Sequence, residues 1–144
     1  MTLKPLLTLP ALLLSLMAWA DQPAIPDDNA LRQALLGTWQ AVDSPAATQI
    51  NGEGTFTADG KASGYTTATY VYQDGYTSDV KINLQYQWQL NNRVITLDQF
   101  VSDPKGFIKA TEVKRFEIQS MTADSLVLKD LADGEAVYRR RKPG

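Results

Sequence analysis

Residues 80–90 alternate strictly between apolar and polar side chains, and this pattern constrains the fold more than any other feature of the chain. The apolar side chains are those of Val80, Ile82, Leu84, Tyr86, Trp88 and Leu90. Each residue between them is Lys, Asn or Gln. A period of two places successive side chains on opposite faces of a β-strand. The pattern therefore predicts a long strand with one buried face and one wetted face.

Seven further segments have the composition of strands, so eight strands are expected in sequence. The other seven cover residues 39–42, 50–57, 61–72, 93–100, 109–119, 126–128 and 136–141. Most are separated by short turns such as Asp59-Gly60 and Asn91-Asn92. We interpret the series as an all-β, eight-stranded, antiparallel up-and-down barrel, because closure removes the unpaired edge strands. A β-sandwich is the alternative architecture.

A short helix is predicted immediately before the first strand. It covers residues 30–36, with Asp27 or Asp28 as its N-terminal cap and Gly37 at its end. Leu31 and Leu35 share one face of this helix. Since a helix of two turns is marginal alone, we expect these leucines to pack on another part of the fold.

The lengths of the connections predict which end of the barrel is open. The links after the second, fourth and sixth strands are tight, and those after the first, third and fifth cover residues 43–48, 73–79 and 101–108. Alternate links of an up-and-down barrel lie at opposite ends. One end is therefore expected to be closed by the helix, Trp39 and the final arginines, and the other end to form a mouth.

The N-terminal residues resemble a secretory signal peptide. Lys4 precedes an apolar run from Leu6 to Met17, and Ala18-Trp19-Ala20 has the pattern of a cleavage site. The run is short for a membrane span, which needs about 20 apolar residues, although an uncleaved anchor is the alternative. We expect residues 1–20 to be removed after Ala20, residues 21–36 to be a lead-in with the short helix, and residues 37–144 to form the barrel of a periplasmic or secreted protein. After cleavage no membrane span is expected.

Composition argues against several classes of function. The chain has no Cys and no His, which removes Ser-His-Asp and Cys-His catalytic systems and the usual zinc sites. A formal net charge of −2 gives no electrostatic footprint for nucleic acid. We therefore expect a monomer that is not an enzyme, holds no cofactor or metal, and binds no nucleic acid. Four carboxylates that could gather at the mouth leave Ca²⁺ as an alternative: Asp43, Asp74, Asp79 and Asp103.

Four short motifs, in this order, resemble the calycin superfamily and specifically small bacterial lipocalin-like domains. They are Leu35-Leu36-Gly37-Thr38-Trp39, residues 54–60, residues 124–128 and the closing Tyr138-x-Arg140. The resemblance implies an eight-stranded barrel with a small interior pocket. It also implies that Trp39 stacks on an Arg of the last strand.

We assign this closing arginine to Arg140, because Ala136, Tyr138 and Arg140 share a face. Gly37, Trp39 and Arg140 are then the predicted closure residues. Arg139 is the alternative if a bulge shifts the phase. The resemblance brings no ligand with it.

Aromatic side chains are the candidate ligand-binding residues. Tyr86 and Trp88 could line an interior pocket, with plain core filling as the alternative. The others are expected near the mouth, where exposed aromatic groups commonly bind: Tyr65, Tyr70, Tyr76 and Phe107. The predicted function is binding of a small apolar or amphipathic molecule in the barrel. The alternative is a protein-binding module, of an inhibitor or immunity type, that uses the mouth loops to hold a protein partner.

Overall fold

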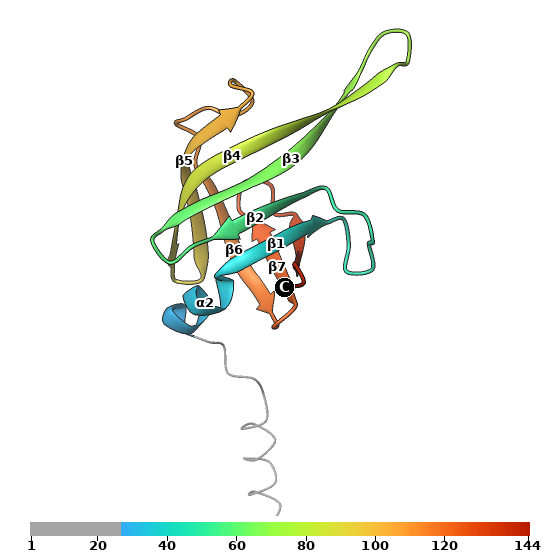
Figure 1. Cartoon of the computed structure of the whole chain (residues 1–144). Helices are drawn as coiled ribbons and strands as arrows, with labels where there is room; N and C mark the ends of the chain where they lie inside the picture. The colour runs from blue at the N-terminus through green and yellow to red at the C-terminus, as the bar shows by residue number, and fades with distance from the viewer. Residues whose placement is uncertain (1–26) are drawn as a thin grey trace, which may run out of the picture.

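A computed structural model describes residues 27–144, in which eight antiparallel strands close into a barrel in chain order (Figure 1). The helix α2 (Asp28–Leu35) precedes them. The strands are β1 (Gly37–Val42), β2 (Gly52–Phe56), β3 (Lys61–Val71), β4 (Thr77–Asn91), β5 (Val94–Asp103), β6 (Lys114–Met121), β7 (Ser125–Asp130) and β8 (Ala136–Arg141). The predicted up-and-down barrel is confirmed. The predicted signal peptide lies outside the described residues.

The alternating segment forms β4 as expected, with Ile82, Trp88 and Leu90 buried, Leu84 and Tyr86 partly buried, and the polar residues between them exposed. However, β4 begins at Thr77, three residues earlier than the predicted strand, and it joins β3 through a tight turn, where the Tyr72 N–H donates to the Tyr76 carbonyl at 2.8 Å. Residues 73–79 are therefore not a long mouth loop. The β-branched and aromatic residues near this turn favour strand pairing. The resulting hairpin projects well beyond the barrel (Figure 1).

A bulge in β5 changes which of its side chains face the interior. Gln87 pairs with Asp98 and Gln85 pairs with Val101, so two residues of β5 stand opposite Tyr86. Gln99, one of these two, has a positive φ of 54°. The extra residue shifts the alternation, so that buried Ile95 and buried Phe100 both face inward.

The helix α2 packs across one end of the barrel. Asp27 caps it by accepting a 2.8 Å hydrogen bond from the Ala30 N–H. The Asp28 carboxylate accepts from the backbone N–H groups of Asn92 and Arg93, at 2.6 and 3.0 Å. These contacts fix the helix to the turn between β4 and β5, and Leu31 and Leu35 are buried in the core beneath it. The prediction that the leucines pack on the fold is confirmed.

The hydrophobic core fills the half of the barrel nearest α2. Its most completely buried large side chains are Trp39, Leu35, Ile95, Ile118 and Leu126. Side chains therefore fill most of this end, and a larger space for a ligand has to be sought further along the barrel. In residues 27–144, no helix has the length and apolarity needed to cross a membrane.

Candidate functional site

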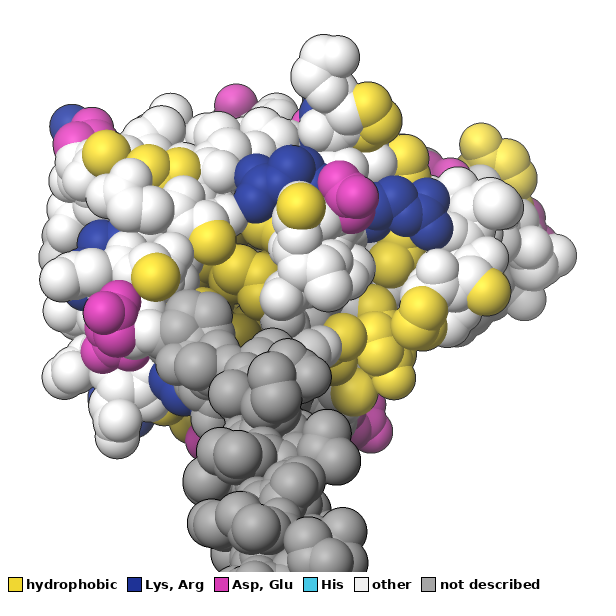
Figure 2. Space-filling view, turned by 90° about the horizontal axis from the view of Figure 1, so that it is seen from below, with side chains coloured by type: hydrophobic (Ala, Val, Ile, Leu, Met, Phe, Trp, Pro, Cys, Tyr) yellow, Lys and Arg dark blue, Asp and Glu magenta, His cyan; other side chains and the backbone are white. Residues whose placement is uncertain are grey.

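The closed end is organised by one arginine that stacks on Trp39. The Arg141 guanidinium lies 4.1 Å from the centre of the Trp39 ring. It donates to the carbonyls of Leu36, Ala34 and Ala123, at 2.9, 2.5 and 2.7 Å. Arg141 thus ties β8 to the end of α2 and to the turn between β6 and β7. Figure 2 views the molecule from this end, where Lys and Arg side chains lie beside apolar ones.

The assignment of the closing arginine to Arg140 is wrong by one residue. Trp39 pairs with Arg141 in the ladder between β1 and β8, and side chains of directly paired residues lie on the same face of a sheet. Arg140 instead donates to the Ala47 carbonyl in the loop after β1. The predicted stack on Trp39 is present. Gly37 belongs beside it, since its φ is +112° and a Cβ would lie 3.0 Å from an Arg141 nitrogen.

Above Trp39 the barrel encloses a cavity of about 90 Å³. Its wall is mostly apolar and is formed by Trp39, Gly54, Phe56, Tyr86, Ile95, Leu97, Phe116, Leu126, Leu128 and Arg139. Tyr86 packs against Phe100 with ring centres 5.2 Å apart. Side chains thus fill most of the barrel interior. The remaining space contains polar groups, because Tyr86 and Arg139 both line it.

The two polar side chains of the cavity are affected by their burial. Desolvation raises the pKa of Tyr86, although the positive charge of Arg139 opposes this shift. Desolvation also lowers the pKa of Arg139. A guanidinium nevertheless stays protonated in proteins, and the Tyr86 hydroxyl keeps its proton at neutral pH. The cavity therefore presents a cation and a hydroxyl donor within an apolar wall.

A larger pocket of about 490 Å³ lies at the open end of the barrel. It is lined by Thr66, Ile82, Leu84, Phe107, Ile108, Lys109, Glu112 and Lys114. The inner faces of β3 and β4 form one wall, and the loop between β5 and β6 forms the other. Phe107 in this loop contacts Tyr70 edge to face at 6.2 Å between ring centres. We call this space the mouth pocket.

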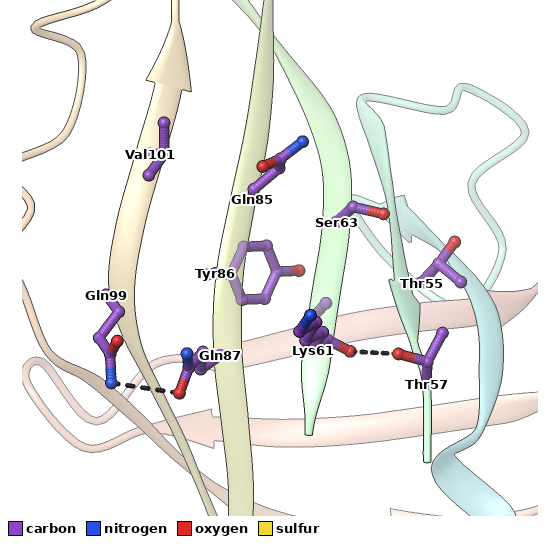
Figure 3. A pocket seen from close by; sticks show the side chains of 10 residues that line it. Thr55, Thr57, Lys61, Ser63, Gln85, Tyr86, Gln87, Gln99 and Val101 are labelled. Atoms are coloured by element: carbon purple, nitrogen blue, oxygen red, sulfur yellow. Dashed lines mark hydrogen bonds between the residues drawn. The ribbon is translucent and has the colours of Figure 1, made fainter. Parts of the chain in front are cut away.

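A third hollow, of about 510 Å³, lies on the outside of the barrel over β2 to β5 (Figure 3). Apart from Ala62, Tyr86 and Val101, its lining is polar: Thr55, Thr57, Lys61, Ser63, Gln85, Gln87 and Gln99. Gln99 donates to Gln87 at 3.1 Å, and Thr57 donates to the Lys61 carbonyl at 2.8 Å. With this polar lining, the hollow does not suit an apolar ligand.

The predicted ligand residues do not converge on one site. Tyr65 faces away from the barrel interior and lies under Lys81, whose Nζ is 4.3 Å from its ring centre, so its assignment to a barrel site is wrong. Trp88 is buried core that packs on Phe56 and donates to the Thr57 carbonyl. Tyr76 is 65% exposed at the hairpin turn.

Three of the predicted residues lie where a ligand could meet them. Phe107 lines the mouth pocket, Tyr70 contacts Phe107 at its rim, and Tyr86 lines the interior cavity. A ligand-binding role for each of them stays a prediction.

Sequence reasoning missed the residues that form most of the mouth pocket. Ile82 and Leu84 could have been predicted, because they belong to the apolar face of β4 and lie on the mouth side of Tyr86. Ile108 and Lys109 could not, since only the folded loop brings them over the barrel. Arg139 was considered only as a closure residue, and the register of β8 places it in the cavity wall.

The four carboxylates considered for Ca²⁺ have other partners or stand apart. Asp43 accepts a hydrogen bond from Asn51, and Asp79 accepts one from Thr69. Within residues 27–144, no group of three or more His, Cys, Asp or Glu side chains could hold a metal ion.

No protein-family model and no curated protein matches the sequence. Among solved structures, the chain is similar to a lipocalin-like protein from Bacteroides uniformis, with 16% identity and a TM-score of 0.49. The match covers 76% of this chain and 99% of that one. The architecture follows from the strand order: a short helix precedes eight antiparallel strands that close into a barrel in chain order. The fold is lipocalin-like. In this lipocalin-like barrel, the mouth pocket and the interior cavity lie on the same inner wall.

Proposed function

We propose that this chain is an exported protein that binds a small amphipathic molecule in the mouth of its barrel. The observation that carries this proposal is the mouth pocket of about 490 Å³. Ligand sites in proteins commonly have volumes of about 300–1,000 Å³ and apolar walls with a few polar groups. Here apolar surface comes from Ile82, Leu84 and Phe107. Charged groups come from Lys109, Glu112 and Lys114. A molecule with an apolar body and a polar end matches both.

Export and the absence of catalysis belong to the same proposal. Export rests on the signal-peptide pattern of residues 1–20. The absence of catalysis rests on a chain without His or Cys, which lacks the common nucleophile and acid–base systems. We propose a monomeric binding protein that works without a cofactor.

A second candidate function is capture of a protein partner by the projecting hairpin of β3 and β4. Val71, Tyr72 and Tyr76 are 72%, 53% and 65% exposed, and the two tyrosine rings are 5.6 Å apart. Exposed aromatic clusters of this kind are common in protein interfaces. This candidate does not require a ligand in the mouth pocket.

The first test is titration with N-phenylnaphthylamine, a neutral apolar dye whose fluorescence rises on binding. We expect saturable binding of one dye per chain. Leu84→Gln introduces an unpaired amide into the apolar wall and should weaken dye binding about tenfold, since burying such a group costs more than about 1.4 kcal/mol. Phe107→Ala should weaken dye binding as well. Because Phe107 lies in the loop between β5 and β6, this substitution should leave the barrel folded.

The matched control is Val101→Gln, which makes a similar substitution on the outside of the barrel. Val101 is 60% exposed on the neighbouring strand, so dye affinity should stay at the wild-type value. Failure of the wild-type chain to bind the dye, or equal binding by all the variants, would argue against the mouth pocket and favour the protein partner.

A further inference from the structure

Arg139 places a positive charge in the wall of the interior cavity without an acidic partner. Its Nη1 donates to the Tyr138 carbonyl at 2.9 Å, which is a single bond for a group with five N–H donors. No Asp or Glu side chain in the described part of the chain forms an ion pair with it. The other side chains of the cavity wall are apolar apart from Tyr86. The cavity therefore holds an uncompensated cation.

Closure of the barrel does not account for this charge. The stack on Trp39 and the three carbonyl contacts at that end belong to Arg141. Arg140 points elsewhere, to the Ala47 carbonyl. A partly buried cation that no acid neutralises costs stability, and an apolar side chain of similar length would pack there without that cost. Closure thus does not explain why a charged side chain stands at this position, whereas a ligand of opposite charge would.

We infer that the ligand carries a carboxylate, that this group enters the interior cavity and pairs with Arg139, and that its apolar remainder points toward the mouth. This inference rests on the proposed function and names the chemical class of its ligand. A planar guanidinium can hold a carboxylate through two parallel hydrogen bonds. The Tyr86 hydroxyl lines the same cavity and can donate a third.

The two spaces lie close enough for one molecule to occupy both. Tyr86 lines the cavity and Leu84, two residues away on the same face of β4, lines the mouth pocket. Two residues of a strand span about 7 Å, or roughly five methylene groups of an extended chain. A cavity of about 90 Å³ takes a carboxylate and a short stem but not a whole amphiphile. The rest of the chain would pass the paired rings of Tyr86 and Phe100 on its way to the mouth.

The experiment compares two ligands with the same tail, decanoic acid and decanol, as competitors that displace bound N-phenylnaphthylamine. In the wild-type chain we expect the acid to displace the dye at concentrations at least about tenfold lower than the alcohol, because hydrogen bonds to charged groups are the stronger kind. In Arg139→Met this ratio should fall to about one. In Arg140→Met, the adjacent arginine on the other face of β8, the ratio should stay as in wild type.

Stability separates a binding role from a structural one. Arg139→Met removes an unpaired charge, so the apo protein should unfold at the same temperature as wild type or higher. A clear fall in melting temperature, with the acid-to-alcohol ratio unchanged, would overturn the inference. Arg139→Lys keeps the positive charge but lacks the planar guanidinium, so we expect a reduced but measurable preference for the acid. This variant keeps the test decisive if Arg139→Met does not fold.

The possible failures are distinguishable. Equal displacement by acid and alcohol in the wild-type chain would contradict the inference about Arg139 and leave the proposed function standing. A wild-type chain that does not bind the dye at all would contradict the proposed function as well.

Discussion

Replacing Trp39 by alanine is expected to destabilise the barrel by about 3–5 kcal/mol. Trp39 is 1% exposed, stacks under Arg141 and donates from its ring nitrogen to the Leu35 carbonyl at 2.9 Å. The substitution therefore opens a cavity in the core, removes the stack and leaves the Leu35 carbonyl without this donor. Equilibrium unfolding in urea, followed by circular dichroism, measures the loss.

The control for this prediction is Val101→Ala, a truncation at an exposed site on the outside of the barrel. It should change the free energy of unfolding by less than about 0.5 kcal/mol. A loss below about 1 kcal/mol in Trp39→Ala would show that this ring does not close the barrel.

Replacing Gly64 by alanine is expected to cost about 3 kcal/mol or more, although it adds a single methyl group. A Cβ at this position would lie 2.0 Å from the Glu53 carbonyl oxygen and 2.9 Å from the Gly54 Cα. Both are backbone atoms of β2, so no flexible side chain can move aside. The variant has to push β2 and β3 apart where the sheet bends tightly.

Ser63→Ala is the matched control, because it changes the preceding residue on the exposed side of the same strand. Its free energy of unfolding should stay within about 0.5 kcal/mol of wild type. Thermal unfolding of both variants measures the difference, and a Gly64→Ala protein as stable as wild type would contradict the close approach of β2 and β3.

The elements with strong local patterns could be predicted from the sequence. The strict alternation in β4 and the Asp cap with two leucines in α2 each depend on a few neighbouring residues. The tight turns placed the helix, Trp39 and the final arginines at one end, and the structure agrees. The tight turn between β3 and β4 was harder to predict than these elements. Its residues have the same composition as a long loop, because Gly, Asp and Tyr are common in both.

The phase of β8 could not be predicted from its own residues. The inner face of β8 carries Val137, Arg139 and Arg141, and therefore two charges. The outer face carries Ala136, Tyr138 and Arg140, with one charge. Patterning favours the less charged face as the inner one, and that preference misplaced the closing arginine. The register with Trp39, which is a long-range property, overrides it.

The candidate site depended even more on long-range structure. The bulge at Gln99 changes the inward side chains of β5, and the loop of residues 104–113 brings Phe107 and Ile108 over the mouth. Neither could be predicted from spacing along the chain. Tyr86 was found because the alternation of β4 already placed it on the inner face.

The most direct test of a ligand-binding barrel is native mass spectrometry of the full chain, expressed with residues 1–20 and recovered from the periplasm without organic solvent. We expect a one-to-one complex with a small molecule, or with added decanoic acid, that is lost on denaturation and reduced in Leu84→Gln. A spectrum that shows the apo mass alone, even with decanoic acid in excess, would contradict ligand binding by this barrel.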